Sequence, residues 1–485
     1  MKARPLTSED VGWILPNAFL ILTMQTGFGL LEAGYVELHN VTNTMLKNTC
    51  DVILGGFMYW AIGYGLTFGE PTNWFCGTGS FFLQVPSLNE TGGATYAHYV
   101  FQFTFATAST TIASGAVVER MRFPAYLGFS TFNILAYCFP ASWAWNPNGF
   151  LAQIGFHDFA GSCVVHVTGG ASALVATLYL GPRLNKIDEK TGYLQRTLVS
   201  PVMALTGTFM LWWAWLGFSS GSTFGTGGNL WKLAAKVAIN TLNGSIGGGI
   251  VGIVYGWVSS HGRSYDIPHI SSGILAGLVG VTAGGAVFSP GMSLVFGALG
   301  SLAANVTGDL LIRLRVDDPV GTIGVHWAAG VVGTLGVGLV GKNVHNFELL
   351  QPGREGLLTG NRALTQLAVQ CVGIVSMTVW SGTVTYVCFA AMNRLIAVRQ
   401  TPDNERIGSD VVTHGLKKTT TVMARFEAAV VRSCYAAGLS LDHLVQPLVD
   451  LALRPNNKLP RNNAAPADAI ERDWPGSSAT TPLDN

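Results

Sequence analysis

Long runs of apolar residues alternate with short polar stretches over most of this chain. A membrane-spanning helix needs about 20 mostly apolar residues, and about eleven runs meet that requirement. Their approximate bounds are 11–33, 46–68, 97–119, 123–143, 158–181, 199–219, 231–258, 269–289, 291–313, 321–341 and 364–393. The pattern therefore predicts an all-α polytopic membrane protein with about eleven transmembrane helices.

Basic residues in the short loops predict the orientation of these helices. One set of alternate loops carries Arg120, Arg122, Arg183, Lys186, Lys190, Arg196, Arg263, Arg313 and Arg315. The opposite loops at 69–96, 144–157 and 220–230 contain no Lys or Arg. The basic set is therefore predicted to be cytoplasmic. After an odd number of spans, the N-terminus is expected outside and the C-terminus in the cytoplasm.

Composition agrees with a membrane bundle and makes a nucleic-acid partner unexpected. Only 11% of the residues are charged, 49% are hydrophobic, and 60 of the 485 are glycine. Small residues let transmembrane helices approach closely, so tight packing is expected. The formal net charge is +1, and no basic face suggests nucleic acid. We predict a transmembrane domain at 1–398 and a cytoplasmic, partly disordered tail at 399–485.

Two histidines lie inside predicted spans with matching neighbours. Asp158 precedes His166 by eight residues, and Asp318 precedes His326 by eight, 160 residues later. A glycine follows each histidine by four residues. An ionisable residue within a membrane span is costly and points to a functional site. Two in register predict a duplicated protein in which each half contributes one imidazole to a central site. Spans 1–5 and 6–10 form the halves, with one extra helix, and an odd number of spans in each half makes this 5+5 repeat inverted.

Three interpretations of the histidine pair are open at this level. One is a polar contact between packed helices, and another is paired axial ligation of haem. The third is a proton-handling pore, because imidazole titrates near neutrality and its two nitrogens can pass on a hydrogen bond. Asp317 and Asp318 are expected to cap the following helix. Asp158 suits both a helix cap and the attraction of a cation.

Aromatic residues gather near the predicted external ends of these helices. Phe101 and Phe105 are four residues apart and share one helix face, and Phe218 and Ser222 have the same spacing. Trp145 is predicted in the external loop before Asp158. Tryptophan at a membrane interface is commonly an anchor. The alternative is a site where ring faces replace water around a small cation.

Taken together, these residues resemble the Amt/Rh ammonium transporter family, and the Amt branch more closely than the Rh branch. The resemblance covers about residues 10–415. It is carried by Gly29-Leu-Leu-Glu-Ala-Gly34, Lys47-Asn48, Phe101-Gln-Phe-Thr-Phe105, Glu119-Arg-Met-Arg-Phe123, Asp158-Phe-Ala-Gly161 with His166, Gly217-Phe-Ser-Ser-Gly-Ser222, Asp317-Asp-Pro319 with His326, and Gly408-Ser-Asp-Val-Val-Thr-His-Gly415. Two departures are one extra residue in the loop after Trp145 and Ser219 where the family commonly has Asn.

The resemblance implies roles for individual residues. Phe101, Trp145, Ser222 and Asp158 correspond to an external ammonium-binding site, Phe105 and Phe218 to a phenyl gate, and His166 and His326 to the twin histidines of the pore. It also implies a homotrimer in the cell membrane that takes ammonium or ammonia as its substrate. No catalytic residue, cofactor or metal is expected, and the protein is not expected to be an enzyme. The bacterial PII-type regulator is not carried over, because the chain resembles eukaryotic members.

Transport of ammonium is therefore the expected function. The open alternatives are an electroneutral gas channel for NH3 or CO2 and an ammonium sensor that signals through the tail. Gly408 and Asp410 lie in the family-like part of the tail, and Thr420 follows two lysines, so a phosphate there would change the local charge strongly. We predict that this segment regulates the pore. Asn89 begins an Asn-Glu-Thr sequon in a predicted external loop and is a glycosylation candidate.

Overall fold

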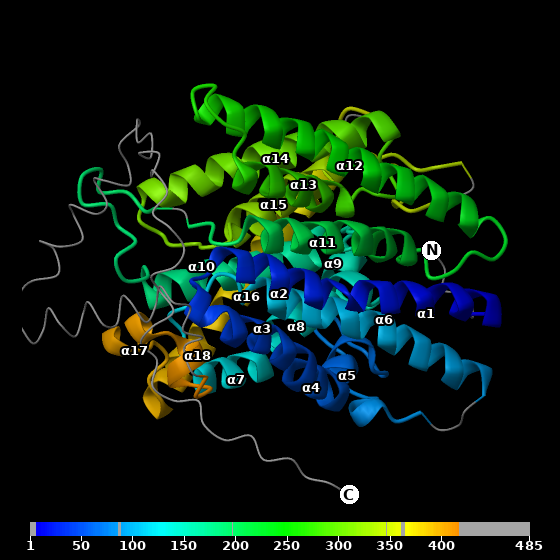
Figure 1. The fold of residues 1–485 in the computed structure, drawn as a ribbon. Coiled ribbons are helices and arrows are strands. Elements are labelled where there is room, and N and C mark those ends of the chain that lie inside the picture. Colours follow the sequence, from blue (N-terminus) through cyan, green and yellow to red (C-terminus); the bar gives the residue numbers. More distant parts are fainter. Residues whose placement is uncertain (1–5, 86–88, 196, 346, 360–363, 417–485) are drawn as a thin grey trace, which may run out of the picture. The chain divides into compact units, whose positions relative to one another are not determined.

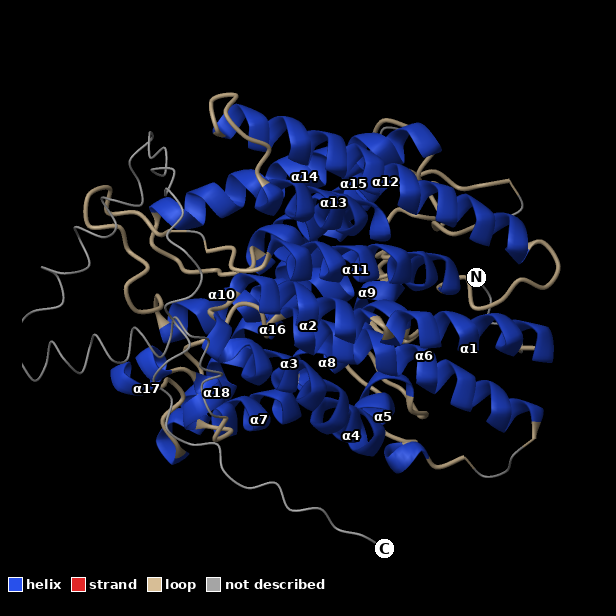
Figure 2. Ribbon diagram, viewed as in Figure 1, coloured by secondary structure: helices blue, strands red, loops and turns tan. Residues whose placement is uncertain are grey.

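The computed structural model describes residues 6–85, 89–195, 197–345, 347–359 and 364–416. Within these ranges every regular element is a helix, and Figure 2 draws no strand among them. One compact unit ends at Leu416, so residues 399–416 pack with the helices although we assigned them to the tail. Residues 417–485, which include Thr420, lie outside the described residues.

The α-helices are α1 (Ser8–Leu22), α2 (Met24–Tyr35), α3 (Val41–Cys50), α4 (Gly56–Met58), α5 (Tyr64–Phe68), α6 (Glu90–Ile112), α7 (Phe123–Phe132), α8 (Ile134–Trp145), α9 (Phe150–Gln153), α10 (Thr168–Leu180), α11 (Pro201–Gly221), α12 (Leu230–Ser259), α13 (Ile267–Thr282), α14 (Pro290–Arg313), α15 (Ala329–Val340), α16 (Thr365–Leu395), α17 (Pro402–Ile407) and α18 (Ser409–Val412). Wider π-helical turns form η2 (Asp51–Gly55), η3 (Tyr59–Gly63), η5 (Ser162–Val167) and η6 (Ile323–Ala328). Short 3-10 turns form η1 (Leu38–Asn40) and η4 (Phe81–Leu83).

Seven helical segments of the described chain are long and apolar enough to cross a membrane. They are Ser8–Tyr35, Ser162–Leu180, Pro201–Gly221, Leu230–Ser259, Pro290–Arg313, Ile323–Val340 and Thr365–Leu395. Helices α3 to α8 and α13 cover the remaining predicted ranges. The prediction of an all-α polytopic membrane protein is confirmed. The count of eleven, the inverted repeat and the orientation stay predictions.

Glycines allow the close packing of α12 against α14. A Cβ atom on Gly297 would lie 2.1 Å from the carbonyl oxygen of Gly244, which is far inside van der Waals contact. Large apolar side chains on the outer faces of these helices and of α16, such as Ile250, Leu294 and Val375, are exposed. Apolar side chains exposed on the outer faces of the bundle match a bilayer environment.

Three differences from the predicted boundaries bear on the candidate site residues. Helix α8 continues to Trp145, so this residue lies in the last helical turn and not in a loop; the helix ends there because Asn146 precedes a proline and is extended. Helix α6 stops at Ile112, and turns follow as far as Arg120; within them Glu119 has a positive φ of 66°. Residues 158–161 are not helical, and the helical turns begin at Ser162.

Candidate functional site

His166 and His326 face each other in the interior of the bundle. Their Nδ1 atoms are 3.1 Å apart, and the ring centroids are 5.2 Å apart at an interplanar angle of 20°. One Nδ1 must donate and the other accept, so the two neutral rings carry their protons on different nitrogens. Opposed metal–nitrogen bonds of about 2 Å would separate the nitrogens by about 4 Å. The geometry therefore fits a hydrogen-bonded pair better than a pair of haem ligands.

Each histidine lies on a π-helical segment that follows its aspartate. The N–H of His166 donates to the carbonyl of Gly161, five residues earlier, in a wide turn of the kind often found at functional sites. The Ser162 hydroxyl donates to Val279 O at 2.7 Å and so fixes the start of η5 against α13. The two matched sequence motifs thus fold into matched local structures.

Asp158 and Asp318 cap the helical segments that carry the histidines, and Asp317 does not. The Asp158 carboxylate accepts from the backbone N–H groups of Gly161, Cys163 and Val164 at 2.8–2.9 Å, so it caps the start of η5. Asp318 accepts from the first N–H groups of its helix at 2.6 and 3.0 Å, as expected for a cap. The prediction for Asp317 was wrong, because its carboxylate binds Arg183 instead.

A stacked pair of phenyl rings lies beside the histidines. Phe105 and Phe218 have centroids 4.0 Å apart and an interplanar angle of 8°. Both are buried, and the Phe218 ring lies 5.7 Å from the His166 ring. Access to the histidine pair from this side is therefore lined by apolar rings, where a bare cation is costly.

Phe101 and Trp145 extend this row of rings. Phe101 lies 4.9 Å from Phe105, and the Trp145 ring meets Phe105 edge-on at 5.8 Å. The Trp145 indole N–H donates to the Asp158 carbonyl at 2.8 Å, which orients the ring. Ser222 is buried at the end of α11, and its hydroxyl donates to the Phe218 carbonyl at 2.9 Å. Its oxygen keeps lone pairs that can accept a further hydrogen bond.

Three aromatic residues of the site were not predicted from the sequence. Trp215 stacks on His166 at 4.8 Å and 16°, and its indole donates to Thr282. Trp215 precedes Phe218 by three residues on α11, so helical spacing could have found it. Phe224 packs edge-on against Phe101 at 5.0 Å, and Phe28 lies 6.1 Å from His326. These two come from distant segments, and no spacing pattern connects them with the histidines.

On the side away from the phenyl pair, His326 borders one small cavity, and a second cavity lies next to the first. One of about 20 Å³ is lined by residues that include His326, Ser272 and Val320. A second, of about 40 Å³, shares Ser272 and Val320 and reaches Arg183. The segment Ser162–Leu180 separates Trp145 from Arg183 by about 27 Å of helix at 1.5 Å per residue. We therefore name the two ends of the bundle the Trp145 end and the Arg183 end.

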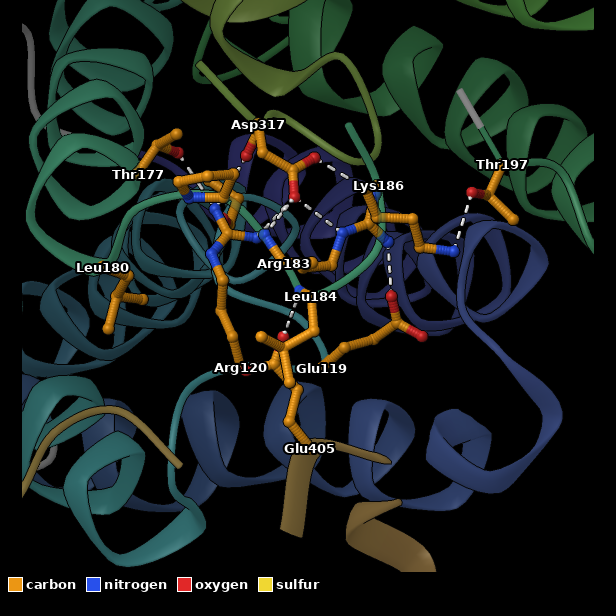
Figure 3. Close-up of polar contacts among 12 residues, drawn as sticks. Glu119, Arg120, Thr177, Leu180, Arg183, Leu184, Lys186, Thr197, Asp317 and Glu405 are labelled. Atoms are coloured by element: carbon orange, nitrogen blue, oxygen red, sulfur yellow. Dashed lines mark hydrogen bonds and ion pairs between the residues drawn. The ribbon is translucent and has the colours of Figure 1, made fainter. Parts of the chain in front are cut away.

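Buried ion pairs hold the connecting segments together at the Arg183 end. Arg183 pairs with both Asp317 and Glu119 (Figure 3). Its Nε atom lies 2.9 Å from Asp317 Oδ2. Arg120 donates to the Asp317 carbonyl at 2.7 Å. Burial raises the pKa of Asp317, but the charge and hydrogen bonds of Arg183 outweigh this effect and hold that pKa below its usual range. The network ties the turns after α6 and α10 to the start of η6.

The family-like tail segment packs on the same end, where Figure 1 places α17 and α18. The Asp410 carboxylate accepts from the N–H groups of Thr42 and Asn43 at 3.1 and 2.7 Å, at the start of α3. A Cβ atom on Gly408 would lie 2.1 Å from the His39 ring, and φ there is +99°. Both residues thus fix this segment to the bundle of their own chain. Asn89 is exposed and caps α6 through Gly92 N–H at 2.9 Å.

Comparison with known proteins agrees with this arrangement. The model of the Ammonium Transporter Family matches residues 12–419. Putative ammonium transporter 3 of Caenorhabditis elegans is 35% identical over 85% of this chain, a match that spans 61% of that protein. Ammonium transporter Amt2 of Archaeoglobus fulgidus is 31% identical over 85% of this chain and 89% of its own length.

Solved structures give the same result. A sensor Amt protein superposes with a TM-score of 0.75 at 28% identity, covering 84% of this chain and 98% of that one. Candida albicans Mep2 superposes with a TM-score of 0.73 at 26% identity, covering 82% of this chain and 88% of that one. With a family match over most of its length, this chain belongs to the ammonium transporter family.

Proposed function

We propose that this protein conducts ammonium by binding NH4⁺ at the Trp145 end, removing its proton and passing NH3 along the histidine pair. The observation that carries the proposal is the continuous row of aromatic rings that ends at His166. Phe101 and Trp145 offer ring faces, and Ser222 offers an acceptor oxygen, to a cation that has lost part of its water. Asp158 adds a carboxylate 2.8 Å from the backbone that it caps, near the same site.

The phenyl pair of Phe105 and Phe218 is the proposed gate and the place near which the proton leaves. A bare cation is costly in an apolar passage, whereas neutral NH3 is not. NH3 donates and accepts hydrogen bonds, so it suits imidazoles that hold one another at 3.1 Å. The histidines then supply polar contacts in a passage otherwise lined by Trp215, Phe218 and Phe28.

A sensor function is the second candidate, because one of the similar solved structures is a sensor Amt protein. In this chain the contacts of Asp410 and Gly408 with the start of α3 offer a route between the tail and the helices. We propose that these residues, together with Thr420, regulate conduction. An electroneutral channel for NH3 or CO2 is the remaining alternative. Family resemblance supports a homotrimer in the cell membrane, and the sequon supports glycosylation at Asn89.

The test is ammonium flux in cells that express the full chain. Inward current and uptake of ¹⁵N-labelled ammonium should both appear on addition of ammonium and be absent with potassium. Uptake without current would select the electroneutral alternative. Surface expression with neither uptake nor current, but with an ammonium-dependent change in cell signalling, would select the sensor.

A further inference from the structure

A buried glutamate shares a cavity with His326, one of the two paired histidines. The cavity of about 20 Å³ beside His326 is also lined by Glu32, on α2. A volume of about 10–15 Å³ is enough to hold one water molecule. Glu32 and His326 are the titratable residues that line it, and both are buried. One water molecule therefore has room next to both an imidazole and a carboxyl group.

Hydrogen bonds hold the Glu32 carboxyl group in place. The hydroxyl of Ser114 donates to Oε1, and Asn48 Nδ2 donates to Oε2 at 2.9 Å. Ser114 lies in the turns between α6 and α7, which lead to the Arg183 end. A hydroxyl group can both accept and donate a proton. Glu32 thus lines the cavity on one side and on the other contacts the Ser114 hydroxyl, which can relay a proton.

Two further buried charges lie close to Glu32. Lys47 is fully buried, donates to the Met121 carbonyl at 3.1 Å and lies over the Tyr126 ring. Asp51 is fully buried and accepts from Tyr126 and Thr111 at 2.7 and 3.1 Å. We call Glu32, Lys47 and Asp51 the Glu32 cluster. Unlike Glu32, neither Lys47 nor Asp51 lines the cavity beside His326.

The Glu32 cluster holds more acid than base. It has two carboxyl groups and one ammonium group. The neighbouring buried charged residues do not balance the extra carboxyl group. Adding them gives four buried acids against three buried bases, namely Glu32, Asp51, Glu119 and Asp317 against Lys47, Arg120 and Arg183. Both oxygens of the Glu32 side chain accept hydrogen bonds, as a carboxylate does, and a buried carboxylate without a matching cation is stabilised when it takes up a proton. A purely structural ion-pair network has no need of this excess acid.

We propose that Glu32 accepts the proton that ammonium delivers to the histidine pair, so that proton and NH3 separate at this cavity. The proposal rests on the conduction described above. An N–H bond of the protonated His326 breaks and an O–H bond forms on the water molecule. Another O–H bond of that water breaks as one forms on the Glu32 carboxylate. The imidazole returns to neutral, and the step needs no oxidant or reductant.

The experiment measures charge moved per ammonia transported by the full chain in proteoliposomes, from current and ¹⁵N uptake in one preparation. Glu32→Gln keeps the shape, and its amide oxygen can accept from Asn48 while its NH2 group donates to the Ser114 hydroxyl, but it cannot take up the proton. Its charge per ammonia should fall at least about tenfold, because positioned proton acceptors contribute about 10² to 10⁴ in rate. Asp51→Asn removes the same charge from the cluster outside the cavity and should keep the wild-type ratio. Glu32→Asp keeps a carboxyl group and should retain more charge per ammonia than Glu32→Gln.

Each other outcome overturns the inference. A wild-type ratio in Glu32→Gln, or an equal fall in Asp51→Asn, would remove Glu32 as the acceptor. If Glu32→Gln fails to fold, as judged by size-exclusion chromatography, Glu32→Asp decides, because its shorter side chain holds the carboxyl group farther from the cavity. A ratio below that of Asp51→Asn supports the acceptor, and an equal ratio removes it. Wild-type uptake without current contradicts the proton branch while leaving ammonium conduction intact. Absence of any wild-type ammonium flux contradicts the proposed function itself.

Discussion

Replacing Trp145 by leucine tests whether the aromatic entrance binds a cation. The indole ring lies half-buried against Phe105 at 5.8 Å, and its N–H donates to the Asp158 carbonyl at 2.8 Å. Leucine keeps apolar bulk and removes both the ring face and the donor. The lost cation–π attraction is worth about 0.5–2 kcal/mol. Half-saturation of the ammonium current should therefore shift by about 2- to 30-fold to higher concentration.

Trp145→Phe separates the two lost contacts, because it keeps a ring face and removes the donor to Asp158. The hydrogen bond contributes about 1 kcal/mol to the folded protein and acts on ring position more than on the ion. Half-saturation should thus rank wild type lowest, Trp145→Phe next and Trp145→Leu highest. The assay is voltage clamp over a series of ammonium concentrations, with surface protein quantified in parallel. Equal half-saturation in wild type and Trp145→Leu at equal surface density would refute the cation site and leave Trp145 as an anchor.

Three further results are expected. Arg183→Ala leaves Asp317 and Glu119 buried without their cation, so thermal unfolding of purified protein should show a loss of about 3–5 kcal/mol; an unchanged midpoint would contradict this. The lowered pKa of Asp317 means that its pairing stabilises the fold above the ordinary Asp pKa and is lost as pH falls through the lowered folded value. Unfolding midpoints of wild type and Asp317→Asn should therefore converge in acid, and a constant difference would argue against the pair. Truncation after Arg399 removes the contacts of Asp410 with α3 and should change current per surface molecule, as should Thr420→Asp through its added charge; equal currents in both would exclude the tail from regulation.

The sequence predicts the class of fold well because transmembrane helices are set by local composition. Hydrocarbon forces backbone groups to pair within each segment, so apolar length alone locates most helices. Prediction from the sequence is less accurate where polar contacts between distant residues determine the backbone conformation. The turns after Ile112 depend on Glu119 reaching Arg183, 64 residues away, and no local pattern contains that pairing.

The site residues likewise fall into those whose role is set by nearby sequence and those whose role depends on distant segments. Asp158 and Asp318 cap the segments that carry the histidines, and that role is encoded within eight residues of sequence. The role of Asp317 was missed because its partner, Arg183, follows a different helix. The stacking of Trp215 on His166 and the cavity shared by Glu32 and His326 also arise from distant segments that only the fold brings together.

The most direct test of the conduction pathway is ammonium transport by His166→Ala and His326→Ala in proteoliposomes with equal amounts of protein. Each change removes a hydrogen bond worth about 1 kcal/mol, too little to unfold a large bundle. Both variants should stay folded, and each should lose most of its ammonium uptake or its coupling to charge. Normal uptake and normal current in both variants would contradict a pathway through the histidine pair.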